Sequence, residues 1–281
     1  MRVRCLNPDA VRNIQVAHGQ FAAVCYGTPE KYAKRVGQSC IETEHMSGSR
    51  CEYIKFEVDG VDRGTAEQCL RHEIGVKVPF EMQDNYDIAD EIDRIANVPA
   101  DEVVKNMASF RYIDKDGFAW AVPGRIERNE RARARYGALM EHINRERRVI
   151  KGMLEKGGVS PAEATEAANF CLPRATTTAF TIGFTPEALM RFCNKRLCVR
   201  AQEFARELAQ EMRGLIWELN RPLAERLVPQ CEHYLWCPEG KRTCGRYPTK
   251  EQVREMVREA RGKERKENAG NKEGIDEGVL R

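Results

Sequence analysis

The feature that most constrains the fold is a strand-like run at residues 176–184, followed at once by a helix start. The run Thr-Thr-Thr-Ala-Phe-Thr-Ile-Gly-Phe is β-branched and aromatic, which favours a strand. Thr185, Pro186 and Glu187 then supply a cap residue, a proline for the first helical turn and an acidic side chain for the helix N-terminus. Apolar residues continue at helical spacing to Leu219, just before Pro222. The pattern predicts a strand packed against one long helix over residues 185–222.

Shorter segments of both kinds precede this unit. Residues 20–27 and 51–61 are apolar and β-branched enough to predict strands, and residues 63–72 have helical spacing. Residues 125–155 predict a long charged helix with one apolar stripe, whose members are Tyr136, Leu139, Met140, Ile143, Val149 and Met153. The fold class expected is α+β, a small mixed sheet with long helices.

Changes of composition suggest three regions. The main domain is expected at residues 1–222, interrupted by an acidic helical insertion at residues 78–105. A cysteine-rich segment follows at residues 223–248. Residues 249–281 predict a charged helix with a disordered tail.

Composition limits the classes of partner. The 46 basic residues nearly cancel the 43 acidic ones, which argues against bulk nucleic-acid binding. No stretch approaches 18 continuous apolar residues, so no membrane span is expected. The N-terminus has no apolar segment typical of a signal peptide, and the 11 cysteines are therefore interpreted as reduced thiols of a cytoplasmic protein.

Two separated segments read as halves of one motif. Arg71 and His72 form the first half, and residues 106–112 (Asn-Met-Ala-Ser-Phe-Arg-Tyr) form the second. Further segments occur around them in a consistent order: His45-Met46-Ser47 before a strand, residues 168–173 (Ala-Asn-Phe-Cys-Leu-Pro), and residues 192–196 (Phe-Cys-Asn-Lys-Arg) followed by Ala-Gln. Together they resemble the signature of the flavin-dependent thymidylate synthase family over roughly residues 18–222.

The resemblance implies an activity. It implies reductive methylation of dUMP to dTMP, with FAD as cofactor and with NADPH and methylenetetrahydrofolate as co-substrates. It also implies a homotetramer, because the family builds its active sites at subunit interfaces. The flavin carries the difficult chemistry in such an enzyme, and the protein orients and tunes the reactants.

The resemblance also assigns site residues. Arg196 matches the arginine that favours ionisation of the pyrimidine and so activates C5, which makes it the expected catalytic residue. The residues expected to bind dUMP are Gln68, Arg71, Ser109, Arg111 and Arg196. The residues expected around FAD are Ser47, Arg71, His72, Glu73 and Arg191. Guanidinium groups and hydroxyl donors suit the phosphate of such a substrate.

Several positions depart from the family pattern. Glu73 stands where a third basic residue is expected, Met107 replaces a glutamate, and Asn169 replaces an arginine that contacts the nucleotide phosphate. Thr185 and Glu187 stand where the family places Asn and Arg on the flavin. Two alternatives therefore remain open: C5 modification of another pyrimidine nucleotide, or an inactive homologue that binds a nucleotide or a partner.

The cysteine-rich segment allows a separate prediction. Cys231, Cys237 and Cys244, with His233 between them, lie within fourteen residues. These are side chains that bind zinc or an iron–sulfur cluster. The spacing lacks the Cys-x-x-Cys pair of a strong zinc motif, so reduced thiols that pack the loop against the main domain are the alternative.

Overall fold

A four-stranded antiparallel sheet organises the chain in the computed structural model, which describes residues 1–46, 48, 52–70, 103–108, 113 and 115–276. The strand order is β1-β2-β4-β3. The strands are β1 (Arg2–Cys5), β2 (Ile54–Asp62), β3 (Val103–Met107) and β4 (Thr177–Phe184). The α+β fold class predicted from the sequence is confirmed.

The two central strands carry the core. Phe56 and Val58 on β2 have no exposed surface, and Phe184 on β4 is equally buried. Phe56 pairs with Ile182 across the two strands, and the register shifts between Asp59 and Val61, where Gly60 has φ +73°. Alternate residues of each strand face the same side, so these side chains form one apolar face.

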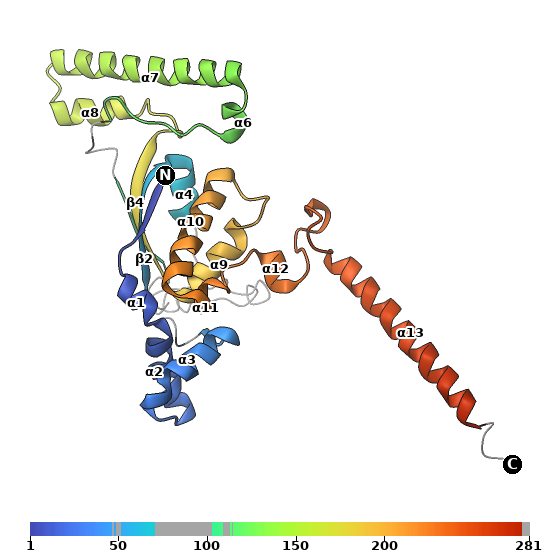
Figure 1. Cartoon of the computed structure of the whole chain (residues 1–281). Helices are drawn as coiled ribbons and strands as arrows, with labels where there is room; N and C mark the ends of the chain where they lie inside the picture. The colour runs from blue at the N-terminus through green and yellow to red at the C-terminus, as the bar shows by residue number, and fades with distance from the viewer. Residues whose placement is uncertain (47, 49–51, 71–102, 109–112, 114, 277–281) are drawn as a thin grey trace, which may run out of the picture.

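Helices α9 (Pro186–Arg196) and α10 (Glu203–Leu219) contribute the other half of the core. Figure 1 shows them beside the sheet together with α4 (Arg63–Leu70). Leu208, Met212 and Ile216 recur on α10 at four-residue intervals and are all fully buried. That spacing is one face of a helix, which is why α10 packs as it does.

The helix predicted over residues 185–222 is wrong in one respect, because it is interrupted. α9 ends at Arg196, and α10 begins at Glu203. α10 is followed by the short α11 (Arg221–Ala224). The break places Arg196 at a helix end instead of in the middle of a long helix.

The strand predicted at residues 20–27 is wrong. These residues form the second half of helix α2 (Ile14–Tyr26) and its C-cap, Gly27. α2 crosses α3 (Ala33–Glu42), which follows the short η1 (Glu30–Tyr32). A Cβ atom on Gly19 would lie 1.7 Å from the Ala33 carbonyl oxygen, and one on Gly37 would lie 1.9 Å from the Gln15 carbonyl oxygen. The two glycines therefore let the helix backbones touch.

α7 (Glu130–Lys156) and α8 (Pro161–Asn169) lie at one end of the sheet, and α2 and α3 lie at the other (Figure 1). Asn129 caps α7 by accepting a hydrogen bond from the Ala132 N–H at 3.0 Å. Ser160 caps α8 by accepting from the Glu163 N–H, and its hydroxyl also donates to the Glu163 side chain at 2.6 Å. The helix predicted at residues 125–155 is confirmed as α7, preceded by α6 (Gly124–Glu127).

The acidic insertion lies mostly outside the described residues. Its last three residues, 103–105, are an exception, because they begin β3 and pair with residues 182–184 of β4. The helical prediction is therefore wrong there: two consecutive valines favour a strand, and β4 offers an open edge for pairing.

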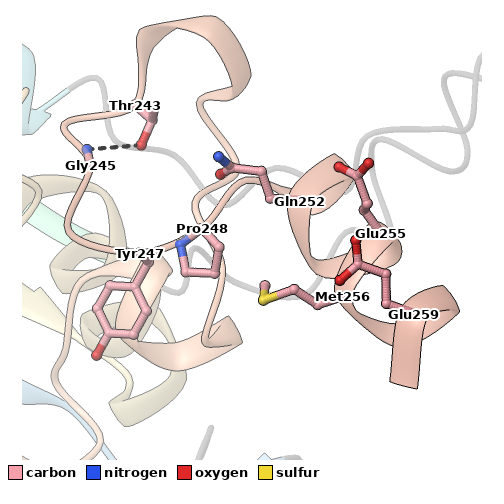
Figure 2. A pocket seen from close by; sticks show the side chains of 8 residues that line it. All are labelled: Thr243, Gly245, Tyr247, Pro248, Gln252, Glu255, Met256 and Glu259. Carbon is pink, nitrogen blue, oxygen red and sulfur yellow. Dashed lines mark hydrogen bonds between the residues drawn. The ribbon is translucent and has the colours of Figure 1, made fainter. Parts of the chain in front are cut away.

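The C-terminal part is built from short elements and one long helix. These are α12 (Gln230–Tyr234), η4 (Gly240–Arg242) and the long α13 (Lys250–Asp276). One further short helix, α1 (Pro8–Arg12), lies near the N-terminus of the chain. α13 runs away from the body of the protein (Figure 1). Its first turns and the loop before it enclose an open groove of about 490 Å³ (Figure 2), lined by Thr243, Gly245, Tyr247, Pro248, Gln252, Glu255, Met256 and Glu259.

Within the described part of the chain, no helix is both long and apolar enough to cross a membrane.

Candidate active site

Arg196 stands at the C-terminal end of α9 because of how that helix is built. Thr185 caps the helix by accepting a hydrogen bond from the Ala188 N–H at 3.2 Å, and Pro186 occupies the first turn. Leu189 and Phe192 anchor the helix in the core with no exposed surface. Arg196 is then held in the last turn, where a cation is favoured by the helix dipole.

The ends of α9 and α4 meet at Arg196. Its Nη2 atom donates to the main-chain carbonyl oxygen of Gln68 at 3.4 Å. Its Nε atom is buried and has no hydrogen-bond partner among the described residues. A buried guanidinium N–H without a partner is costly, and the Nε atoms of Arg213 and Arg226 are in the same state. At Arg196 the geometry therefore leaves an N–H that can donate to a ligand. Two of the residues predicted for the substrate, Gln68 and Arg196, are thus brought together.

α4 is fixed at its other end by polar contacts that sequence reasoning missed. Asp62 accepts a hydrogen bond from the Thr65 N–H at 2.9 Å, and the Thr65 hydroxyl donates to Gln202 at 3.0 Å. Thr65 has no exposed surface. Gln202 precedes α10, so this bond joins α4 to the α9–α10 junction that carries Arg196. An Asp three residues before a Thr at a helix start is the only sequence signal of this anchor.

Cys69, next to Gln68, is unsuited to nucleophilic attack. Burial raises the pKa of its thiol to about 12; the Arg196 charge acts against that rise, and Asp62 adds to it. The thiol therefore stays protonated near neutral pH, and only a thiolate is a good nucleophile. This agrees with chemistry in which no enzyme cysteine attacks the base.

Ser109 and Arg111, predicted to contact dUMP, lie outside the described residues, but their neighbours are placed. Before them, the Ala108 N–H donates to the Ala179 carbonyl of β4 at 2.9 Å. After them, the Asn169 side-chain amide donates to the Ile113 carbonyl at 3.1 Å. Asn169 is itself buried, so at this position, where the family pattern has an arginine, the side chain holds the chain downstream of the motif.

The predicted FAD set is described at one position only. Ser47, Arg71, His72 and Glu73 lie outside the described residues. Arg191 lies on the exposed side of α9, where its guanidinium group forms an ion pair with Glu187, one turn earlier. The Arg191 side chain is 51% exposed, whereas that of Glu187 is only 15% exposed. The guanidinium group is therefore the accessible member of the pair.

A second group of side chains gathers around a cavity of about 260 Å³ between the end of α9 and the cysteine-rich segment. Cys231, Cys237 and Cys244 line it, as the metal prediction grouped them. Cys198 lines it as well and was not predicted; its only signal is its place just beyond the α9 helix. His233 instead places its Nδ1 atom 3.4 Å from Glu44. Within the described residues, no group of three or more His, Cys, Asp or Glu side chains is arranged to hold a metal ion.

Comparisons with known proteins agree with this arrangement. A family model described as "Thymidylate synthase complementing protein" matches residues 10–219. The chain is 32% identical over 216 residues to a flavin-dependent thymidylate synthase of Nitratidesulfovibrio vulgaris, covering 76% of this chain and 77% of that protein. It is 26% identical over 211 residues to one from Clostridium tetani, covering 72% of this chain and 71% of that protein. It is 27% identical over 204 residues to one from Geobacter sulfurreducens, covering 72% of each.

Proposed function

The chain belongs to the flavin-dependent thymidylate synthase family, and on that premise we propose that it converts dUMP to dTMP by reductive methylation. Methylenetetrahydrofolate would supply the carbon and NADPH the reducing power. The observation that carries the proposal is the family match over residues 10–219. Arg196 supports it, because its side chain stands where α4 and α9 meet and its buried Nε has no partner in the described structure.

Arg196 is proposed to act on the pyrimidine ring. A guanidinium group beside N3 and a neighbouring carbonyl favours negative charge on the base, which makes C5 a better nucleophile. Because Arg196 is partly withdrawn from water at the end of α9, such a charge interaction is stronger than it would be at the surface. The Gln68 carbonyl fixes one edge of the guanidinium and leaves Nε for the ligand.

The remaining contacts are proposed from the family pattern. Gln68, Arg71, Ser109 and Arg111 would bind dUMP with Arg196. Ser47, Arg71, His72, Glu73 and Arg191 would surround FAD. Hydroxyl, imidazole and guanidinium groups fit the phosphates and the ring of a flavin nucleotide, and Arg191 can leave Glu187 for a phosphate. When bound, FAD supplies the hydride. The metal predicted for the cysteine-rich segment has no part in this chemistry.

A homotetramer is part of the proposal. The apolar stripe predicted to be buried on α7 is largely uncovered in the single chain: Leu139, Val149 and Met153 are 51%, 43% and 67% exposed. Phe170, just after α8, is 87% exposed. Apolar side chains grouped in this way favour association with further subunits. A cytoplasmic location is proposed with it, because the nine cysteines whose side chains the structure describes are all free thiols.

The test is turnover of dUMP by the purified full-length chain supplied with FAD, NADPH and methylenetetrahydrofolate, with UMP and dCMP as competing substrates. Arg196→Ala should lower dTMP formation about 100-fold or more, the cost of removing one donor to a developing anion. Arg196→Lys should restore little, because an ammonium group lacks the planar fork. Arg12→Ala, which removes an exposed arginine paired with Asp9, is the control and should keep full activity.

Two results would contradict the proposal. Faster turnover of UMP or dCMP than of dUMP would favour modification of another pyrimidine nucleotide. Tight dUMP binding without turnover of any nucleotide would favour an inactive homologue.

A further inference from the structure

Four thiols from two distant chain segments share one cavity. Cys198 comes from the turn between α9 and α10, and Cys231, Cys237 and Cys244 come from the cysteine-rich segment. Cys231 and Cys237 are 9% and 6% exposed, whereas Cys244 is exposed. All four are free thiols. The family match ends at residue 219, so three of the four lie beyond it.

The thiols are close enough to act on one another. Burial raises the pKa of Cys231, and the negative charges of Cys198, Cys237 and Cys244 raise it further. Cysteine binds a metal centre as the thiolate, so binding of a cationic centre here would displace the protons of these thiols.

The cavity also suits the charge of a thiolate-bound centre. Lys195 and Arg200 line it beside the thiols, against the single carboxylate of Glu239. Four thiolates around a divalent zinc ion or an iron–sulfur core leave a net negative charge. Two basic side chains at the wall offset that charge.

The segment that carries three of these cysteines has little regular secondary structure to stabilise it. Residues 230–249 contain only the five-residue α12 and the three-residue η4. A bond from the Cys237 N–H to the Pro248 carbonyl at 2.7 Å and an isolated bridge between Cys237 and Thr249 close the loop. Short irregular segments with small cores commonly depend on a metal or a disulfide for stability.

The arrangement of the thiols distinguishes between a single zinc ion and an iron–sulfur cluster. Around one zinc ion, four sulfur atoms would stand about 3.8 Å apart, as follows from zinc–sulfur bonds of about 2.3 Å in a tetrahedron. Six further residues line the cavity of about 260 Å³ with the four cysteines, and among the described residues no three of these thiols are gathered for a single ion. A polynuclear cluster holds its cysteine ligands further apart than one zinc ion does.

We propose that Cys198, Cys231, Cys237 and Cys244 ligate an iron–sulfur cluster in the cavity between α9 and the cysteine-rich segment. His233 is outside the ligand set, because its ring faces Glu44. Cys198 lies two positions after Arg196, so the cluster would also fix the turn that follows the active-site arginine.

The experiment measures iron, acid-labile sulfide and zinc per chain in the full-length protein purified without oxygen, and again after reconstitution with ferrous iron and sulfide. Electron paramagnetic resonance after dithionite reduction separates a cluster signal from that of flavin. The wild type should hold iron and sulfide in equal amounts. Cys198→Ser and Cys237→Ser should lose most of both.

Two matched variants complete the design. Cys171→Ser removes an exposed thiol outside the cavity, and His233→Ala removes the histidine of the sequence-based ligand set. Both should retain the iron and sulfide of the wild type. Far-UV circular dichroism checks that each variant is folded. Zinc without sulfide, no metal after reconstitution, or loss of iron in His233→Ala with retention in Cys198→Ser would overturn the proposal.

Discussion

Replacing Asn220 by alanine should destabilise the protein more than its small size suggests. Its amide nitrogen donates to the Val11 carbonyl at 2.7 Å and to the Gln15 side chain at 2.8 Å, and its oxygen accepts from the Gln15 amide at 2.7 Å. Its oxygen also caps α11 by accepting from the Leu223 N–H. Asn220 and Gln15 are 4% and 7% exposed, so water cannot replace the lost partners.

The expected magnitude follows from these contacts. An orphaned buried polar group costs about 1–3 kcal/mol, and a lost helix cap costs about 1 kcal/mol, so we expect a loss of about 2–4 kcal/mol in the free energy of unfolding. Guanidinium unfolding followed by circular dichroism at one fixed protein concentration would measure it.

The control is Asn13→Ala. Asn13 also donates from its side chain to a carbonyl, that of Asp9 at 2.9 Å, but on the exposed surface. Its loss should change stability by no more than about 0.5 kcal/mol. A double variant with Gln15→Ala should lose less than the two single changes together, because both remove the same pair of bonds. If Asn220→Ala were no more destabilising than Asn13→Ala, the buried amide pair would not have the role described.

Three further outcomes are expected. Gly37→Ala should destabilise the protein by more than about 1 kcal/mol, because its Cβ would lie 1.9 Å from the α2 backbone. Gly214→Ala should stabilise it by about 0.5–1 kcal/mol, because a Cβ there meets nothing within 4 Å. Thermal unfolding of the two variants measures the difference. Burial lowers the pKa of His18 from 6.5, so the unfolded chain binds the proton more readily, and stability should be full above pH 6.5 and fall as the pH drops toward the lowered pKa. Unfolding midpoints of wild type and His18→Gln across that range test this, and an equal slope in both would refute it. In native protein treated with iodoacetamide, exposed Cys171 should be alkylated well before Cys69, whose pKa is raised to about 12; mass spectrometry of the peptides would show the order.

The sequence predicted elements best where local chemistry decides them. Ser160 and Thr185 are the N-cap residues of α8 and α9, and each is followed by proline. This signal is readable from the sequence because it acts within a single helical turn. The strand predicted at residues 20–27 was wrong because a short, mostly apolar run suits a helix as well as a strand. The fact that decided for a helix is the contact of Gly19 and Gly37, which are 18 positions apart.

The missed features depend on contacts that a single segment does not contain. Residues 197–202 include neither glycine nor proline, so nothing local announced the end of α9 after Arg196. The α7 stripe was found by its spacing, but the spacing does not say whether the same chain or another covers it. Cys198 could be grouped with Cys231 only once the chain had folded back on itself.

The sequence indicated which types of residue form the candidate site, but not all of the contacts that position them. The pairing of Gln68 with Arg196 was implied by the family resemblance, and the structure brings both to the same point. The anchor of that point, Thr65 with Gln202, has no strong sequence pattern. The roles assigned to all the site residues stay predictions, and Ser47, Arg71, His72, Glu73, Ser109 and Arg111 lie outside the described residues.

The most direct test of the central claim is the change in flavin absorption when dUMP is added to the full-length protein reconstituted with FAD. Protein-bound flavin, confirmed by the fluorescence of FAD released on denaturation, should shift its bands with dUMP in a saturable way. The same titration of Arg196→Ala should show bound flavin with a much weaker response. Absence of bound flavin after reconstitution, or a flavin spectrum that ignores dUMP, would contradict the proposed dUMP methylation.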